Sequence, residues 1–307
     1  MKGSVWMKKI VVVGSLNYDH NIQLDHLPAV GETILSDSIS YAFGGKGANQ
    51  AVALAKMQVA VGMIGAVGDD AVGSKMIANL QASGVATEGI IIKEQELTGF
   101  ALIYLDHQGK NMIVVHPGAN FKLTVEDIKA KEQLLLEADY CLLQLEIPLD
   151  VIEYVVSFCK EHQIPVVLNP APAVPNLSKE LLSKLTYLVP NETELALLSK
   201  GNVDMDSVED HARSLLALGV SNVLVTLGEH GSCLMNQNDK VFVPAKKVKA
   251  IDTTAAGDSF LGGFLAGLCK GYTQQEAMEL GTKVASITVT RKGAQDAIPS
   301  WDEVTKQ

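Results

Sequence analysis

The chain has few cysteines and no pattern that would pair them or bind a metal. Its four cysteines are widely spaced along 307 residues and include no C-x-x-C pair. The seven histidines include no H-E-x-x-H motif, so we expect neither zinc chemistry nor a disulfide framework. Because the cysteines fall mostly in apolar runs, they are expected to be buried thiols of a reducing cytosol: Cys141, Cys159, Cys233 and Cys269.

Positive charge and long apolar runs are also scarce. The 25 basic residues are outnumbered by 35 acidic residues, which gives a formal net charge of −10. Nucleic acids and anionic membrane surfaces bind clustered positive charge, so we expect neither as a partner. The apolar run before Gly14 is too short for a signal peptide or a membrane span. This composition predicts a cytoplasmic protein that acts on small molecules.

Three common motifs of nucleotide and hydrolase sites are missing. The glycine-rich segment 44–50, GGKGANQ, lacks the Walker spacing, as does segment 68–75. Gly257-Asp258-Ser259 is not followed by the glycine that would close a nucleophile elbow. No G-x-G-x-x-G follows the first expected strand, so a dinucleotide oxidoreductase is not expected.

What the chain does contain is a regular alternation of strands and helices. This alternation predicts an α/β fold with three α/β/α layers, in which a mostly parallel sheet presents ligand sites at the carboxyl ends of its strands. The expected strands cover 10–13, 59–67, 140–145, 165–168, 187–189 and 222–226. The expected helices cover about 48–56, 69–83, 150–161, 192–199 and 207–218, with a hairpin at 232–243 and two further helices, running from 258 toward 271 and from 274 onward.

Two stretches do not fit this alternation. The stretch from about 20 to 43 is broken by Pro28 and Gly31, and the stretch 98–115 resembles a hairpin around His107-Gln108-Gly109. We expect them to form a small β-strand lid, joined to the first strand through a polar loop at 17–19. With no low-complexity linker or internal repeat, the whole chain, 1–307, is expected to be one domain that carries this lid.

The segment from 248 to 264 combines an anion site with an acid. Ala255, Ala256 and Gly257 are nearly without side chains, so their N–H groups can approach a ligand at the start of the helix that follows. Asp258 lies at the same place, where a second negative group would repel a phosphate. Two interpretations are open: Asp258 is a general base toward an attacking hydroxyl, or an acid that stabilises its own helix dipole.

The segment GGKGANQ, 44–50, offers glycine backbone beside Lys46 and Asn49. A ligand could approach its main chain closely, and Asn49 could both donate to and accept from vicinal hydroxyls. The alternative is a tight turn with Asn49 in the first turn of a helix. Glu146 follows an apolar run and therefore lies near the carboxyl end of a strand, where ligand-binding carboxylates are common.

Two further segments lie at expected strand ends. Asn191 and Glu194 are spaced as a helix cap, and they could also hold magnesium-bound water and phosphate. The glycine loop that follows the strand at 222–226 is suited to backbone contact with a nucleotide, and it comprises Thr226, Leu227, Gly228, Glu229, His230 and Gly231.

Taken together, these segments resemble the ribokinase-like family of carbohydrate kinases. The resemblance covers nearly the whole chain, from VGSLNYD at 13–19 to TRKGAQ at 290–295, and its strongest part is DTTAAGDSF with GGKGANQ. It implies transfer of the γ-phosphoryl group of ATP to O5 of D-ribose, with magnesium as cofactor and potassium as activator. It also implies a homodimer formed through the lid.

The resemblance also implies roles for individual residues. Asp258 would accept the proton of the attacking hydroxyl, and the backbone from Ala255 to Asp258 would form the anion hole. Asn191 and the loop 226–231 would contact ATP, while Thr282 stands where similar enzymes often have His or Asn. The sugar would be surrounded by Asn17, Asp19, Gly45, Lys46, Asn49, Glu146 and Asp258.

A monovalent cation site follows from the resemblance as well. The cation would order the turn from Asp252 to Asp258 without touching substrate. Its ligands would be the Asp252 side chain and the carbonyls of Thr254, Thr288, Arg291 and Gly293, with Ala297 at a further ligand position where relatives commonly have Ser. The alternatives are a kinase of deoxyribose, fructose or a nucleoside, and a non-catalytic sugar or nucleotide sensor, in which Asp258 would have no use.

Overall fold

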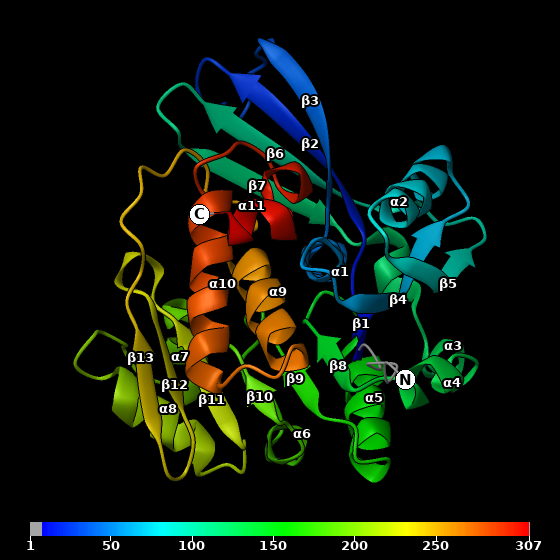
Figure 1. Ribbon diagram of the computed structural model, residues 1–307. Helices are drawn as coiled ribbons and strands as arrows, with labels where there is room; N and C mark the ends of the chain where they lie inside the picture. The colour runs from blue at the N-terminus through cyan, green and yellow to red at the C-terminus, as the bar shows by residue number, and fades with distance from the viewer. Residues whose placement is uncertain (1–7, 307) are drawn as a thin grey trace.

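The computed structural model describes residues 8–306, and its centre is a nine-stranded sheet in the order β13-β12-β11-β10-β9-β8-β1-β4-β5 (Figure 1). All neighbouring strands are parallel except those of the β11-β12-β13 edge. The strands are β1 Lys9–Val13, β4 Ala60–Gly68, β5 Ala86–Lys93, β8 Tyr140–Leu143, β9 Val166–Leu168, β10 Tyr187–Leu188, β11 Asn222–Thr226, β12 Ser232–Met235 and β13 Lys240–Val243. The expected mostly parallel α/β sheet is confirmed.

Helices cover both faces of this sheet, because its strands are apolar on both sides. In β1, Val11 and Val13 join one buried cluster and Ile10 and Val12 join the other. The first face is covered by α3 Val125–Lys129, α4 Glu132–Leu136, α5 Leu149–Glu161, α6 Lys179–Ser183, α7 Glu192–Ser199 and α8 Val208–Leu216. The second is covered by α1 Lys46–Lys56, α2 Ala71–Ala82, α9 Ala256–Cys269 and α10 Gln274–Thr288, with α11 Trp301–Thr305 near the end of the chain.

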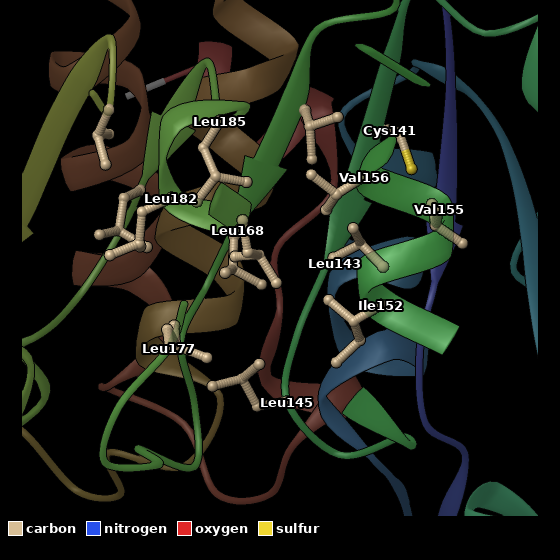
Figure 2. Packing of buried hydrophobic residues seen from close by; sticks show 14 of the residues in the cluster. Cys141, Leu143, Leu145, Ile152, Val155, Val156, Leu168, Leu177, Leu182 and Leu185 are labelled. Carbon is tan, nitrogen blue, oxygen red and sulfur yellow. The ribbon is translucent and has the colours of Figure 1, made fainter. Parts of the chain in front are cut away.

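Aliphatic packing holds the layers together, as the low aromatic content requires. Figure 2 shows Ile152, Val155 and Val156 of α5 in the same buried cluster as Cys141 and Leu143 of β8. All five side chains are 0–1% exposed. Each such side chain contributes about 1.5–3 kcal/mol when it is fully buried. Among the described residues, no helix is long and apolar enough to cross a membrane.

A second sheet of four strands rises from one end of the molecule (Figure 1). Its order is β3 Ser38–Gly44, β2 Asn17–Leu24, β6 Gly99–Asp106 and β7 Asn111–His116. The hairpin expected at 98–115 is present as β6 and β7. The loop expected at 17–19 is wrong, because β2 already begins at Asn17, which pairs with Gly44 and Gly99. Strand β5, which pairs with β4, was not expected either.

The fold brings the ends of several strands to one edge of the main sheet. Gln144 follows β8, Asn169 follows β9, and Asn191 follows β10 and forms a β-bridge with Thr226. The N-terminus of α9 comes to the same edge, because Ala256 and Asp258 share a cavity with three of these residues. This is where a parallel α/β sheet binds its ligands.

Candidate active site

The N-terminus of α9 has the open geometry that an anion needs. Ala255 adopts a left-handed conformation, with φ of +58°, and provides no side-chain cap for the helix. The helix therefore turns abruptly away from the preceding chain. The Ala256 N–H donates to the Thr253 carbonyl at 3.2 Å, while the N–H groups of Gly257 and Asp258 lie in the first turn, where a helix leaves its N–H groups without an intrahelical partner. A Cβ atom at Gly257 would meet no atom within 4 Å. Glycine at 257 thus keeps the approach to these N–H groups free of side-chain atoms.

A cavity of about 200 Å³ lies against this helix end. It brings together residues expected on the sugar side, at the reacting centre and on the nucleotide side. Its lining includes Lys46 from the start of α1, Asn191 and Glu194 from the start of α7, and Thr226 from the end of β11. The remaining lining residues are Asn169, Ala171, Val189, Thr253, Ala255, Ala256, Gly257, Asp258 and Leu261.

The Asp258 carboxylate lies at the wall of this cavity and is 7% exposed. Its Oδ2 accepts from Asn49 Nδ2 at 3.1 Å, and its Oδ1 accepts from Gln50 Nε2 at 2.9 Å. Side chains from α1 therefore hold the acid of α9 across more than two hundred residues of sequence. Such contacts fix the direction of the carboxylate within the site.

Lys46 brings a positive charge to the same cavity. Burial by itself would lower the pKa of its ammonium group. Nearby carboxylates outweigh burial and raise that pKa, namely those of Asp258, Glu146 and Glu194. Lys46 therefore stays charged where a phosphate would need neutralisation.

The turn at Gly45 and Lys46, which is expected beside the sugar, is held by Glu146 and requires glycine. One oxygen of Glu146 accepts from the Lys46 N–H at 3.0 Å and from the Ser15 hydroxyl. Gly45 has φ of +88°, and a Cβ atom there would lie 2.6 Å from the Asn17 nitrogen. This turn therefore requires glycine, which lets β2 and α1 approach closely.

Asn17 and Asp19 extend along β2 from this loop. Asn17 Oδ1 accepts from Asn120 Nδ2 at 2.9 Å, and Asn120 also bonds the main chain of Leu16. Asp19 packs on Gly44, where a Cβ atom would lie 2.2 Å from its Oδ2. Burial, and then the charge of Glu146, raise the pKa of Asp19 to about 7.

The residues expected beside the nucleotide do not all line the same cavity. Asn191 and Glu194 form a complete capping box, so the capping interpretation is realised, and both also line the cavity. Burial raises the pKa of the Glu194 carboxyl. Of the loop 226–231 only Thr226 lines this cavity, and Leu227 is in the core. Thr282 lines a separate cavity of about 690 Å³ between α10 and the segment 242–246.

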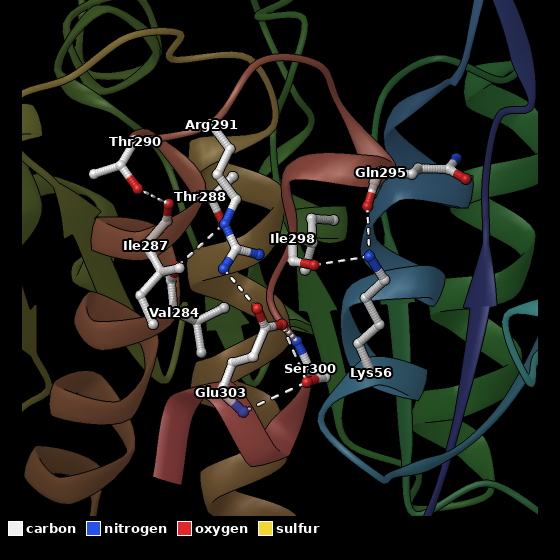
Figure 3. A network of polar contacts seen from close by, with 10 residues as sticks. All are labelled: Lys56, Val284, Ile287, Thr288, Thr290, Arg291, Gln295, Ile298, Ser300 and Glu303. Carbon is white, nitrogen blue, oxygen red and sulfur yellow. Dashed lines mark hydrogen bonds and ion pairs between the residues drawn. The ribbon is translucent and has the colours of Figure 1, made fainter. Parts of the chain in front are cut away.

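The residues expected around a monovalent cation come from two segments, one before α9 and one after α10, which contact each other. Asp252 Oδ2 accepts from the Gly293 N–H at 3.0 Å, and Oδ1 accepts from the Thr254 N–H at 2.9 Å. Burial would raise the pKa of Asp252, but these hydrogen bonds outweigh burial and lower it. Figure 3 shows how the second segment is anchored, with the Arg291 guanidinium 2.6 Å from Glu303 Oε1. The Thr288 carbonyl accepts from the Arg291 N–H, and Ala297 is buried nearby.

Several residues at the site were missed by the sequence analysis. Gln50, Asn120 and Asn169 hold predicted residues or line the cavity, and Thr253 also lines it. Asn169 follows a predicted strand directly and could have been found by that signal. Gln50 and Asn120 act through contacts with distant segments, for which a single sequence carries no signal.

A helix N-terminus, a buried acid and a lysine line one cavity. This combination suits a phosphotransferase, in which positioning and charge neutralisation do most of the work. The comparisons agree with this class. Residues 7–301 match the family model of the pfkB family carbohydrate kinases. The chain therefore belongs to the pfkB family of carbohydrate kinases.

Among individual relatives, the chain is similar to ribokinases and to a deoxyribokinase. The chain is similar to a ribokinase of Schizosaccharomyces pombe, with 40% identity over 97% of each chain. It is 37% identical, over 96% of each chain, to a deoxyribokinase of Salmonella typhi. The solved structure of Arabidopsis thaliana ribokinase complexed with ribose and ATP is 32% identical, has a TM-score of 0.90, and is matched over 97% of this chain and 98% of that one.

Proposed function

We propose that this protein transfers the γ-phosphoryl group of ATP to O5 of D-ribose. One observation carries the proposal: a single cavity is lined by Lys46 of the sugar-side loop, Asp258, and Asn191 with Thr226 of the nucleotide side. Sugar hydroxyl and phosphate can meet only where these three groups are within reach of one another. Relatives named ribokinase support ribose as the sugar.

In the proposed reaction Asp258 accepts the proton of the attacking hydroxyl as it bonds to phosphorus. The N–H groups of the backbone from Ala255 to Asp258 bind the transferred phosphoryl oxygens, on which charge accumulates in the transition state. Lys46, which lines the same cavity, adds a positive charge. The proton therefore moves to Asp258, and the displaced ADP keeps the negative charge of the broken bond.

The hydroxyls of the sugar are assigned to six residues, of which Asn49 contacts Asp258 directly. Asn17, Asp19, Asn49 and Glu146 provide side chains, and Gly45 and Lys46 provide the main chain of the turn. Deoxyribose is the second candidate, because one relative is a deoxyribokinase and no single contact in the chain excludes a sugar lacking one hydroxyl. Fructose or a nucleoside would have to fit the same turn.

Magnesium and potassium are part of the proposal. Asn191 and Glu194 line the cavity, and their amide and carboxylate oxygens also accept from each other's N–H groups in the capping box. Such oxygens are the hard ligands that suit magnesium-bound water. Bound magnesium would neutralise charge on the ATP phosphates. The segments 252–254 and 288–293 meet where Asp252 accepts from the N–H groups of Thr254 and Gly293. One carboxylate with main-chain carbonyls of these segments would be an oxygen set that fits a monovalent cation. Because Asp252 precedes the turn into α9, ordering these segments would order the anion hole.

We also propose that the four-stranded sheet is a lid and the contact surface of a homodimer in the cytoplasm. Strands β3 and β7 are its edges, and every residue of β7 is exposed. The exposed residues Met112, Ile113, Val114 and Val115 form an apolar edge, which a second copy would protect from aggregation.

The test is ADP release measured with ribose, deoxyribose, fructose and adenosine in parallel, each in potassium and in sodium. We expect the highest kcat/KM with ribose and faster turnover in potassium. Release with none of the four compounds would overturn the kinase proposal. A preference for deoxyribose would replace the sugar, and equal rates in both salts, after thorough desalting, would remove the proposed cation site.

A further inference from the structure

Gln50 contacts the Asp258 carboxylate and has no role in the proposed reaction so far. It is 0% exposed and lies next to Asn49 on α1. Its Nε2 donates to Asp258 Oδ1 at 2.9 Å, while Asn49 Nδ2 donates to Oδ2 at 3.1 Å. Each oxygen of the acid therefore has one amide N–H donor from consecutive residues.

The direction of the Gln50 amide is fixed by a chain of contacts that ends on the backbone. Asn169 Nδ2 donates to the Val189 carbonyl at 2.9 Å, and a carbonyl can only accept. Asn169 therefore turns its oxygen to Gln50 Nε2, at 3.1 Å. On the other side, Gln144 Nε2 donates to Gln50 Oε1 at 2.6 Å. Gln50 must consequently present its NH₂ group to Asp258.

A second chain fixes Asn49. Its Oδ1 accepts from Gln295 Nε2 at 3.1 Å, and Gln295 Oε1 accepts from Asn79 Nδ2 at 2.7 Å. The segment around Gln295 is itself held by α1, because Lys56 Nζ donates to the carbonyls of Gln295 and Ile298 at 2.7 Å each (Figure 3). Asn49 is thereby held with its NH₂ group toward the acid.

We propose that Gln50 and Gln295 are positioning residues for Asp258, one by direct contact and one through Asn49. This inference rests on the proposed function in taking Asp258 as the base. Two donors prevent the carboxylate from rotating and leave its remaining lone pairs directed at the cavity, where the sugar hydroxyl would lie. Without Gln50, the acid would stay in the site but turn away from the productive direction.

The test is Gln50→Met, which keeps the side-chain length and removes the donor. We expect kcat to fall about 10- to 100-fold, the effect of one hydrogen bond to a charged group, with KM for the sugar nearly unchanged. Gln295→Met should give a smaller fall of the same kind. The matched control is Gln81→Met, because Gln81 is an exposed glutamine of α2 that bonds only Thr87, and it should leave kcat unchanged.

A double-mutant cycle separates positioning from mere packing. In an Asp258→Asn background, Gln50→Met should lower the residual kcat by less than about twofold, because its effect passes through the Asp258 carboxylate. An undiminished loss in that background, or normal kcat in the single variant, would overturn the proposal. If Gln50→Met does not fold, as judged by thermal unfolding, the same cycle with Gln295→Met decides.

A wrong role for Gln50 can be distinguished from a wrong proposed function. If the wild-type protein phosphorylates another sugar, the cycle is measured with that sugar. If it phosphorylates none, ¹⁵N NMR of the Gln50 side-chain NH₂ group still reads the contact. Its signals should shift between wild type and Asp258→Asn, and unchanged signals would contradict the inferred contact.

Discussion

The two sheets of this protein differ in how far their strands are exposed to solvent. In β1 of the main sheet four of five residues are buried, whereas all six residues of β7 in the four-stranded sheet are exposed. The main sheet is covered by helices on both faces. Asn169 follows its strand β9, and Asn191 lies shortly after β10. A half-covered sheet has less apolar burial to stabilise it and is the part that can move or dock.

The boundary between the sheets is itself part of the site. At the base of β2, Asn17 is 5% exposed and is held by Asn120, while the middle of β3 is exposed. The groups proposed to bind the sugar therefore lie on the buried end of the four-stranded sheet. We infer that closure would move the far end of this sheet and leave Asn17 and Asp19 near their places.

The largest expected effect concerns Asp258, at the edge of the main sheet. Asp258→Asn keeps the shape of the side chain but removes the proton acceptor, so kcat should fall about 10²–10⁴-fold or more. Sugar affinity, measured by calorimetry without ATP, should remain close to that of the wild type. Near-normal turnover would remove Asp258 from the mechanism.

The second prediction compares the two sheets directly by unfolding. Leu143→Ala in β8 removes a fully buried side chain and should lower the free energy of unfolding by about 2–5 kcal/mol. Val114→Ala in β7 removes a side chain that is 51% exposed and should cost less than about 1 kcal/mol. Denaturant titrations at low protein concentration measure both, and equal losses would contradict the proposed division between scaffold and lid.

The sequence predicted the regular part of the molecule well. Strand β11 and helix α7 begin and end where expected, at Asn222–Thr226 and Glu192–Ser199. Their apolar runs and caps are local signals, so neighbouring residues suffice to locate them. One cavity is lined by candidates that the sequence offered in three separate segments, namely Lys46, Asp258 and Asn191, while their roles stay predictions.

The errors arose where distant contacts decide the structure. Segment 17–19 was expected to be a loop, but pairing with β3 and β6 makes it the start of β2. Thr282 is not among these errors: it lines a cavity separate from that of Asp258, and its contact with the nucleotide stays a prediction. Gln50 was missed because its partners are Asp258 and Gln144, both far along the chain. Periodicity reports which face is buried and not which polar groups meet.

The third prediction tests docking of the exposed sheet. Ile113→Lys places a charge on the apolar edge strand, where Ile113 is 54% exposed. We expect self-association at least about tenfold weaker than in the wild type, because a docked copy would bury that charge. Sedimentation velocity over a concentration series measures it, with Glu126→Gln as a control of equal charge change. A monomeric wild type, or an unaffected Ile113→Lys, would contradict the dimer.

The smallest expected effect concerns Asp19, at the junction of the two sheets. Its pKa is raised from 3.8 to about 7, first by burial and then by Glu146. At pH values between these two, Asp19 has lost its proton in the unfolded chain and keeps it in the folded protein. The free energy of unfolding therefore falls as the pH rises toward 7 and stays at its lower value above that pH. Asp19→Asn removes that loss.

We therefore expect Asp19→Asn to melt about 2–6 °C above the wild type at pH 8, with a much smaller difference at pH 4.5. Thermal unfolding without ligand at both pH values gives the comparison. Asp25→Asn serves as the control, because Asp25 lies just beyond β2 with its side chain 82% exposed and carries the same charge. If Asp19→Asn shifts the melting temperature equally at both pH values, the junction does not hold a protonated acid, and the burial at the base of β2 is less complete than the contacts with Gly44 imply.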